Sequence, residues 1–116
     1  MTRTFIQTHE FSSKWDALGF NDENLRQLEN DILKNPNNYP VMVGTGGLHK
    51  ARVAFDGSGK SSGARACYVD FPDNGIVYLI TVFAKNEKSN LSLSERKDIK
   101  GLIKVLKNSI GGNRNE

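Results

Sequence analysis

The sequence has 116 residues, a formal net charge of +3, 37% hydrophobic residues and 25% charged residues. This length fits one compact domain, and the composition is typical of a folded protein and unlike that of a disordered one. The longest apolar stretch, GIVYLITVFA, is far shorter than the ~20 residues of a spanning helix, and the N-terminal residues lack the apolar centre of a secretory signal. We therefore expect a cytoplasmic protein without membrane contact.

The N-terminal third predicts one strand and two helices. RTFIQT (3–8) alternates like a strand, and EFSSKWDALG (10–19) places apolar residues at helical spacing until Gly19 stops the helix. Asn21 is a good N-cap for a second helix, which should end before Pro36. NPNNYP (35–40) is expected to be a connector.

Three strands are expected next. LHKARVAF (48–55) alternates apolar residues with Lys50 and Arg52, as a half-buried strand does. DGSGKSSG predicts a hairpin loop and PDNG a second turn. ARACYVDF (64–71) lies between these turns, and IVYLITVFA (76–84) is apolar enough to be a central strand.

The last element is a helix with a clear start. Ser92 and Glu95 have the spacing of a capping box, and apolar residues follow on one stripe to Ile110. The opposite side carries four lysines, which form either a solvated face or a contact for ribosomal RNA: Lys97, Lys100, Lys104 and Lys107.

The order of these elements predicts an α+β fold. We expect the order β-α-α-β-β-β-α, with the helices packed on a small, mostly antiparallel sheet. Residues 1–110 should form a single domain, and residues 111–116 a disordered tail.

Glycine and positive charge are concentrated in the middle of the chain. Six of the eleven glycines lie between residues 44 and 69. Residues 1–40 carry four cations against six carboxylates, whereas residues 41–69 carry four cations against Asp56 alone. Concentrated positive charge attracts polyanions, so RNA, DNA or an acidic protein segment are candidate partners, beside the simpler interpretation of a solvated surface.

Two common kinds of site are not supported. AFDGSGKS (54–61) nearly matches a phosphate-binding P-loop, but a strand follows where that motif requires a helix, which argues against ATP or GTP binding. The single cysteine, Cys67, with His9 and His49, gives no metal-ligand spacing. We expect neither a metal ion nor a cofactor.

Three segments together resemble the HigB branch of the RelE/ParE toxin family. They are GTGGLHKARVA (44–54), GKSSGARACYVDF (59–71) and YLITVFAKNEKSNLSLSERKDI (78–99), and the match covers about residues 42–107. The resemblance implies a RelE-like fold and the toxin of a type II toxin–antitoxin system. Such a toxin enters the ribosomal A site, cuts mRNA without a metal or cofactor, and is silenced by a cognate antitoxin, commonly a helix-turn-helix DNA-binding protein.

Arginine and lysine side chains can together promote RNA cleavage without a metal ion. Metal-free RNA cleavage requires a group that takes the proton of the attacking 2′-hydroxyl and cations that hold the charge of the transition state. The resemblance makes Arg65 and Lys85 the transition-state contacts, with Lys50 and Arg52 next, for the phosphate backbone and base catalysis. The alternative for each is an exposed cation that serves only solubility. The remaining expected RNA-binding residues are Lys60, Asn86, Glu87, Lys88 and His49.

The sequence departs from its apparent relatives at several positions. His49 stands where an arginine is usual, and it either supplies a proton carrier or records a tolerated loss. Ser61 and Ser62 follow the loop lysine where an arginine often stands, and Ser92 occupies roughly the place of the aromatic base of some RelE toxins. Two other functions therefore stay open: a ParE-like inhibitor of DNA gyrase, or a catalytically decayed module that binds RNA or antitoxin.

Overall fold

The computed structural model describes residues 2–54 and 63–112. The elements in chain order are β1 (Thr4–Gln7), α1 (His9–Ala17), α2 (Asp22–Lys34), β2 (His49–Val53), β3 (Ala64–Phe71), β4 (Ile76–Ala84) and α3 (Leu93–Gly112). This order confirms the predicted α+β class. The predicted hairpin loop and the P-loop-like stretch fall largely on residues 55–62, outside the described residues, as do residues 113–116 of the expected tail. α3 continues two residues past the predicted domain end at 110.

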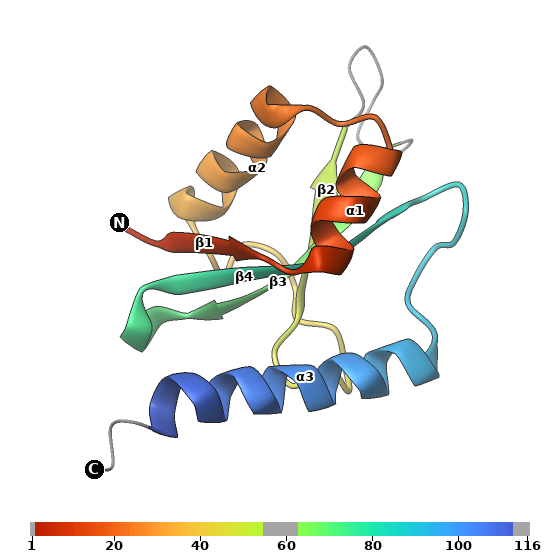
Figure 1. The fold of residues 1–116 in the computed structure, drawn as a ribbon. Helices are drawn as coiled ribbons and strands as arrows, with labels where there is room; N and C mark the ends of the chain where they lie inside the picture. Colours follow the sequence, from red (N-terminus) through yellow and green to blue (C-terminus); the bar gives the residue numbers. More distant parts are fainter. Residues whose placement is uncertain (1, 55–62, 113–116) are drawn as a thin grey trace.

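The four strands form one mixed sheet between two layers of helices. The strand order is β1-β4-β3-β2, with β1 parallel to β4 and the other two pairs antiparallel. α1 and α2 cover one face of the sheet, and α3 crosses the other face (Figure 1). The sheet is therefore mostly antiparallel, as predicted.

Each face of the sheet has its own hydrophobic core, because successive strand residues point to opposite faces. On the α1 and α2 side, the buried residues include Phe11, Ile32, Ala51, Ala66, Tyr68 and Leu79. On the α3 side they include Leu48, Cys67, Val69, Ile80, Phe83 and Ile103. The sheet is thus fixed from both sides, and this fixes the direction of every side chain on β2 and β3.

Local capping signals set where the helices begin. The Thr8 side chain accepts a hydrogen bond from the Phe11 amide at the start of α1. The predicted cap at Asn21 is confirmed, and its oxygen accepts from the Asn24 amide at 2.8 Å. The predicted Ser92–Glu95 capping box is confirmed as well, with reciprocal bonds of 2.9 and 3.0 Å.

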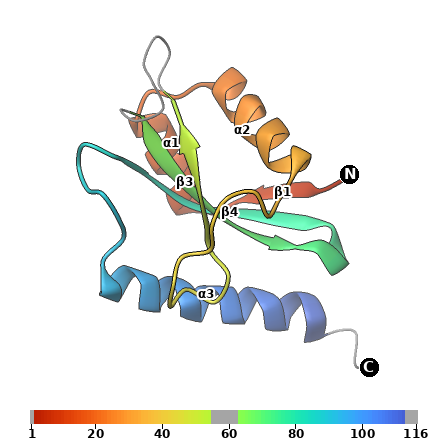
Figure 2. The same cartoon turned by 180° about the vertical axis from the view of Figure 1, so that it is seen from behind.

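The connector between α2 and β2 runs along the free edge of β2 and reaches α3 (Figure 2). The Tyr68 hydroxyl donates to the Pro36 carbonyl at 2.6 Å, which anchors its first part to the sheet. The Thr45 hydroxyl, which is buried, donates to the Met42 carbonyl and accepts from the Leu48 amide, closing the glycine turn. The connector is therefore held along its length by specific bonds.

Across residues 2–54 and 63–112, no helix has both the length and the apolar character needed to span a membrane.

Two glycines allow a matched test of the packing. A methyl group on Gly63 would collide with the Val53 carbonyl oxygen and lie 2.9 Å from the Ala54 Cα, whereas one on Gly101 in α3 would meet nothing within 4 Å. We expect Gly63→Ala to lower the free energy of unfolding by about 1–3 kcal/mol, because backbone must move. Gly101→Ala should raise it by about 1 kcal/mol through helix propensity. Chemical denaturation measures both, and equal effects would contradict the close approach of β2 and β3 at Gly63.

Candidate functional site

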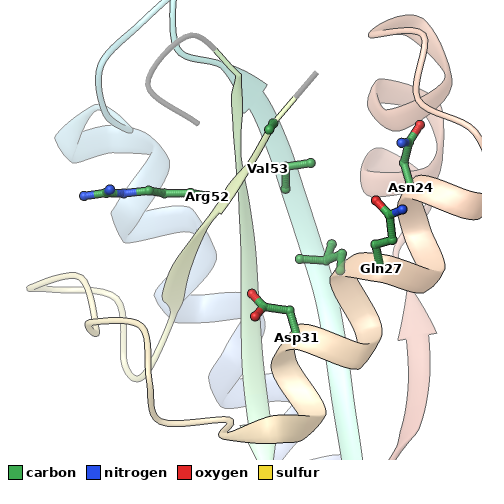
Figure 3. A pocket seen from close by; sticks show the side chains of 7 residues that line it. Asn24, Gln27, Asp31, Arg52 and Val53 are labelled. Carbon is green, nitrogen blue, oxygen red and sulfur yellow. The ribbon is translucent and has the colours of Figure 1, made fainter. Parts of the chain in front are cut away.

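The register of β2 and β3 brings three of the predicted catalytic cations onto one face of the sheet. Arg52 lies directly opposite Arg65, and Lys50 lies opposite Cys67. Cys67 belongs to the core under α3, so Lys50, Arg52 and Arg65 all point to the α3 side of the sheet. In Figure 3 the Arg52 side chain extends away from α2, whereas Val53 extends toward it.

These three side chains line one hollow. The hollow has a volume of about 560 Å³, and its other walls come from the connector residues Asn38, Tyr39 and Pro40. Arg52 is exposed, and Lys50 and Arg65 are partly buried. A polar ligand that enters here meets a cation from each of three positions on two adjacent strands.

Lys85 stands beside this group but does not line the hollow. It is exposed and follows the last residue of β4, and its amide donates to the Gly63 carbonyl at 3.0 Å. This bond extends the ladder in which Arg65 lies opposite Phe83. Lys85 and Arg65 are therefore diagonal neighbours across two strands, a relation in which Cβ atoms are typically about 7–8 Å apart.

The arrangement places like charges face to face. Two like charges directly opposite on neighbouring strands are destabilising. Within residues 2–54 and 63–112, no carboxylate forms an ion pair with Lys50, Arg52, Arg65 or Lys85. The Arg65 guanidinium donates to the carbonyl of the adjacent Ala64, at 3.2 Å. An anionic ligand would supply the charge compensation that the described part of the chain does not.

His49 lies on the opposite face of β2 from Lys50. Its ring is buried, stacks on Tyr68 with centroids 4.9 Å apart, and donates through Nδ1 to the Tyr39 carbonyl at 2.7 Å. The structure therefore does not bring the His49 ring together with the cations. It gives this side chain a packing and anchoring position beneath the connector.

The turn after β4 holds the other expected RNA-binding residues. Asn86 and Glu87 are exposed. The Lys88 ammonium forms an ion pair of 2.6 Å with Glu95 and lies 5.4 Å from the centre of the Phe83 ring. The hydrogen bond from Lys88, with that from Ser92, lowers the pKa of Glu95 to about 2, so the Glu95 carboxylate is charged at neutral pH. Lys88 thus fastens the turn to α3.

Lys60 lies outside the described residues. The residue that sequence reasoning missed is Tyr39, which lines the hollow although it lies in a connector without strand or helix periodicity. The signal that was available is an aromatic residue among polar and proline residues in NPNNYP.

Arg52 also lines a second hollow, of about 180 Å³, between α2 and β2. Gln27 and Asp31 extend toward this hollow from α2 (Figure 3). Within the two described ranges, histidine, cysteine, aspartate and glutamate side chains form no group of three or more that could hold a metal ion.

The chain matches a known family over nearly its whole length. Residues 4–111 match the family described as the RelE toxin of the RelE/RelB toxin–antitoxin system. The protein therefore belongs to this family. Its assignment to the HigB branch stays a prediction.

Solved structures from E. coli share the fold. The chain is similar to a double arginine-to-alanine mutant of the E. coli toxin RelE in the free state, with a TM-score of 0.54 and 17% identity over 77% of this chain and 90% of that one. For the isolated E. coli RelE toxin the TM-score is 0.53, with 17% identity over 88% and 99% of the two chains. The intact E. coli RelBE toxin–antitoxin complex gives 0.52 and 17% over 71% and 94%.

The like-charge pair can be tested by its effect on stability. We expect Arg52→Gln to raise the free energy of unfolding by about 0.2–1 kcal/mol at low salt, because it removes repulsion with Arg65. The gain should shrink as salt screens the charges. Arg26→Gln is the control, because Arg26 is paired with Glu23 on the exposed face of α2. A loss of stability in Arg52→Gln at low salt would show that the two guanidinium groups do not repel each other.

Proposed function

We propose that the protein is the toxin of a type II toxin–antitoxin pair and that it cuts mRNA in the ribosomal A site without a metal ion. The observation that carries this proposal is the hollow lined by Lys50, Arg52 and Arg65, whose charges are not neutralised by any described carboxylate. RNA supplies the missing negative charge through its phosphates. Membership of the RelE family supports the toxin assignment.

The reaction we propose is attack of a 2′-hydroxyl on the adjacent phosphorus. The 2′-oxygen forms a bond to phosphorus while the bond to the 5′-oxygen breaks. The 2′-oxygen loses its proton and the leaving 5′-oxygen gains one, which gives a 2′,3′-cyclic phosphate and a 5′-hydroxyl. The transition state carries extra negative charge on the phosphate oxygens, so fixed cations near them lower the barrier.

Each cation has a role that suits its chemistry. The Arg65 guanidinium is planar, remains charged, and can bind two phosphate oxygens at once. Arg65 is partly buried on β3, and its guanidinium donates to the Ala64 carbonyl at 3.2 Å. Lys85, which lies diagonally across the ladder from Arg65, adds a positive charge on a flexible side chain. Arg52 holds the neighbouring phosphate, and we assign Lys50, in the same hollow, to the phosphate backbone and base catalysis.

The proposed partners are a cognate antitoxin and the ribosome. One structure that shares this fold is a RelBE toxin–antitoxin complex, which supports an antitoxin as the partner. We propose an antitoxin of the helix-turn-helix DNA-binding class. The exposed lysines of α3 favour approach to ribosomal RNA, because each contact with a phosphate releases bound counterions. With these partners, we propose a cytoplasmic location.

The function is tested by removing one cation. We expect Arg65→Ala to lower mRNA cleavage on translating ribosomes by on the order of 10² to 10³, the usual effect of losing one transition-state contact. Primer extension on mRNA from a reconstituted translation reaction measures the new 5′ ends. Arg26→Ala is the control. It removes an exposed arginine on α2 that does not line the hollow, so this variant should cut like the wild type.

Two results would count against the proposal. An unchanged rate for Arg65→Ala would remove Arg65 from the site. Inhibition of gyrase supercoiling by the wild type, with no cleavage of mRNA, would identify a ParE-like inhibitor instead.

A further inference from the structure

One of the described aromatic residues, Tyr39, lines the cationic hollow. Tyr39 shares it with Lys50, Arg52 and Arg65, and its other lining residues are Asn38 and Pro40. Tyr39 is partly buried, because it packs at the rim of the core on the α1 and α2 side, and part of the residue remains accessible. An aromatic surface beside cations is the combination by which proteins bind single-stranded RNA, since bases stack on the ring while the cations follow the phosphates.

Tyr39 is held at two points, its side-chain hydroxyl and its backbone carbonyl. The Tyr39 hydroxyl donates to the Asp31 carboxylate on α2, and the backbone carbonyl accepts from His49 Nδ1 at 2.7 Å. His49 is held in turn by stacking on Tyr68, which bonds the Pro36 carbonyl earlier in the same connector. Tyr39 therefore keeps its position without a ligand, and RNA binding need not order it.

The protonation state of the Tyr39 hydroxyl decides whether it could act as a general base. Burial, followed by the hydrogen bond to Asp31, raises the pKa of Tyr39 to about 12, although the positive charge of Arg52 acts in the opposite direction. The hydroxyl therefore keeps its proton at neutral pH. It donates to Asp31 and is not available to take the proton of a 2′-hydroxyl, which leaves the ring face as the part that can meet RNA.

We propose that Tyr39 is the stacking residue of the site and contacts a base of the RNA strand whose phosphates lie on Arg52 and Arg65. This inference rests on the proposed function and names a residue that positions the substrate. His49 and Asp31 are positioning residues that act through Tyr39. His49 is buried under the connector. It therefore acts on the site by holding Tyr39 and does not contact RNA.

Substitutions separate the ring from its hydroxyl. We expect Tyr39→Leu to lower ribosome-dependent cleavage at limiting protein by about tenfold or more, because one base stack is lost. Tyr39→Phe keeps the ring and should stay within about threefold of the wild type. Tyr78→Leu is the matched control, because Tyr78 is also partly buried but packs edge-on against Phe71 and does not line the hollow. Full activity in Tyr39→Leu, or an equal loss in Tyr39→Phe, would overturn the proposal.

A second measurement uses the unmodified protein and does not depend on variant stability. An mRNA with a 2′-O-methyl group at the cut nucleotide and 4-thiouridine beside it is bound on the ribosome, irradiated, and the cross-linked peptide is sequenced. We expect the cross-link at Tyr39, and a cross-link confined to other residues would refute the stacking role. If unmodified mRNA is cut but Tyr39 is not cross-linked, only this inference fails, whereas absence of any cleavage by the wild type overturns the proposed function and this inference together.

Discussion

The proposed function depends on one feature of the β-ladder, the pairing of Arg52 with Arg65 on adjacent strands. Two guanidinium groups in this relation repel each other, so the rest of the structure must hold them together. It does so by burying both faces of the sheet, against α1 and α2 on one side and α3 on the other. Repulsion cannot be relieved by a one-residue slip, because that slip would expose both cores.

The connector between α2 and β2 forms one wall of the hollow in which these cations lie. Lys50 and Arg52 lie on the edge strand β2 and Arg65 on the neighbouring β3, and residues 38–40 complete the hollow that the three side chains line. The bonds that hold the connector come from buried groups, including His49 and Tyr68. Lys88 and Glu95 fix the turn beside Lys85 in the same way, through an ion pair that leaves Lys85 itself exposed. The cations that we propose to contact RNA are thus distinct from Lys88, which forms an ion pair within the fold.

Much of the fold follows from local signals in the sequence. The caps at Asn21 and Ser92 and the alternation around Lys50 and Arg52 involve neighbouring residues, so they can be interpreted without knowledge of the tertiary structure. The same alternation already separates His49 from Lys50, although the family resemblance favoured grouping them. The place of Tyr39 could not be predicted, because it depends on how a connector without periodicity packs against β2. Likewise, the ion pair of Lys88 with Glu95 depends on how the turn meets α3.

The chemistry of the cut ends tests the central claim most directly. If fixed cations promote attack by the 2′-hydroxyl, mRNA cut on ribosomes by the purified protein will carry a 2′,3′-cyclic phosphate on one fragment and a 5′-hydroxyl on the other. A single 2′-O-methyl group at the cut nucleotide should then abolish cleavage at that position. Fragments with a 5′-phosphate, or continued cutting at the methylated nucleotide, would contradict this mechanism.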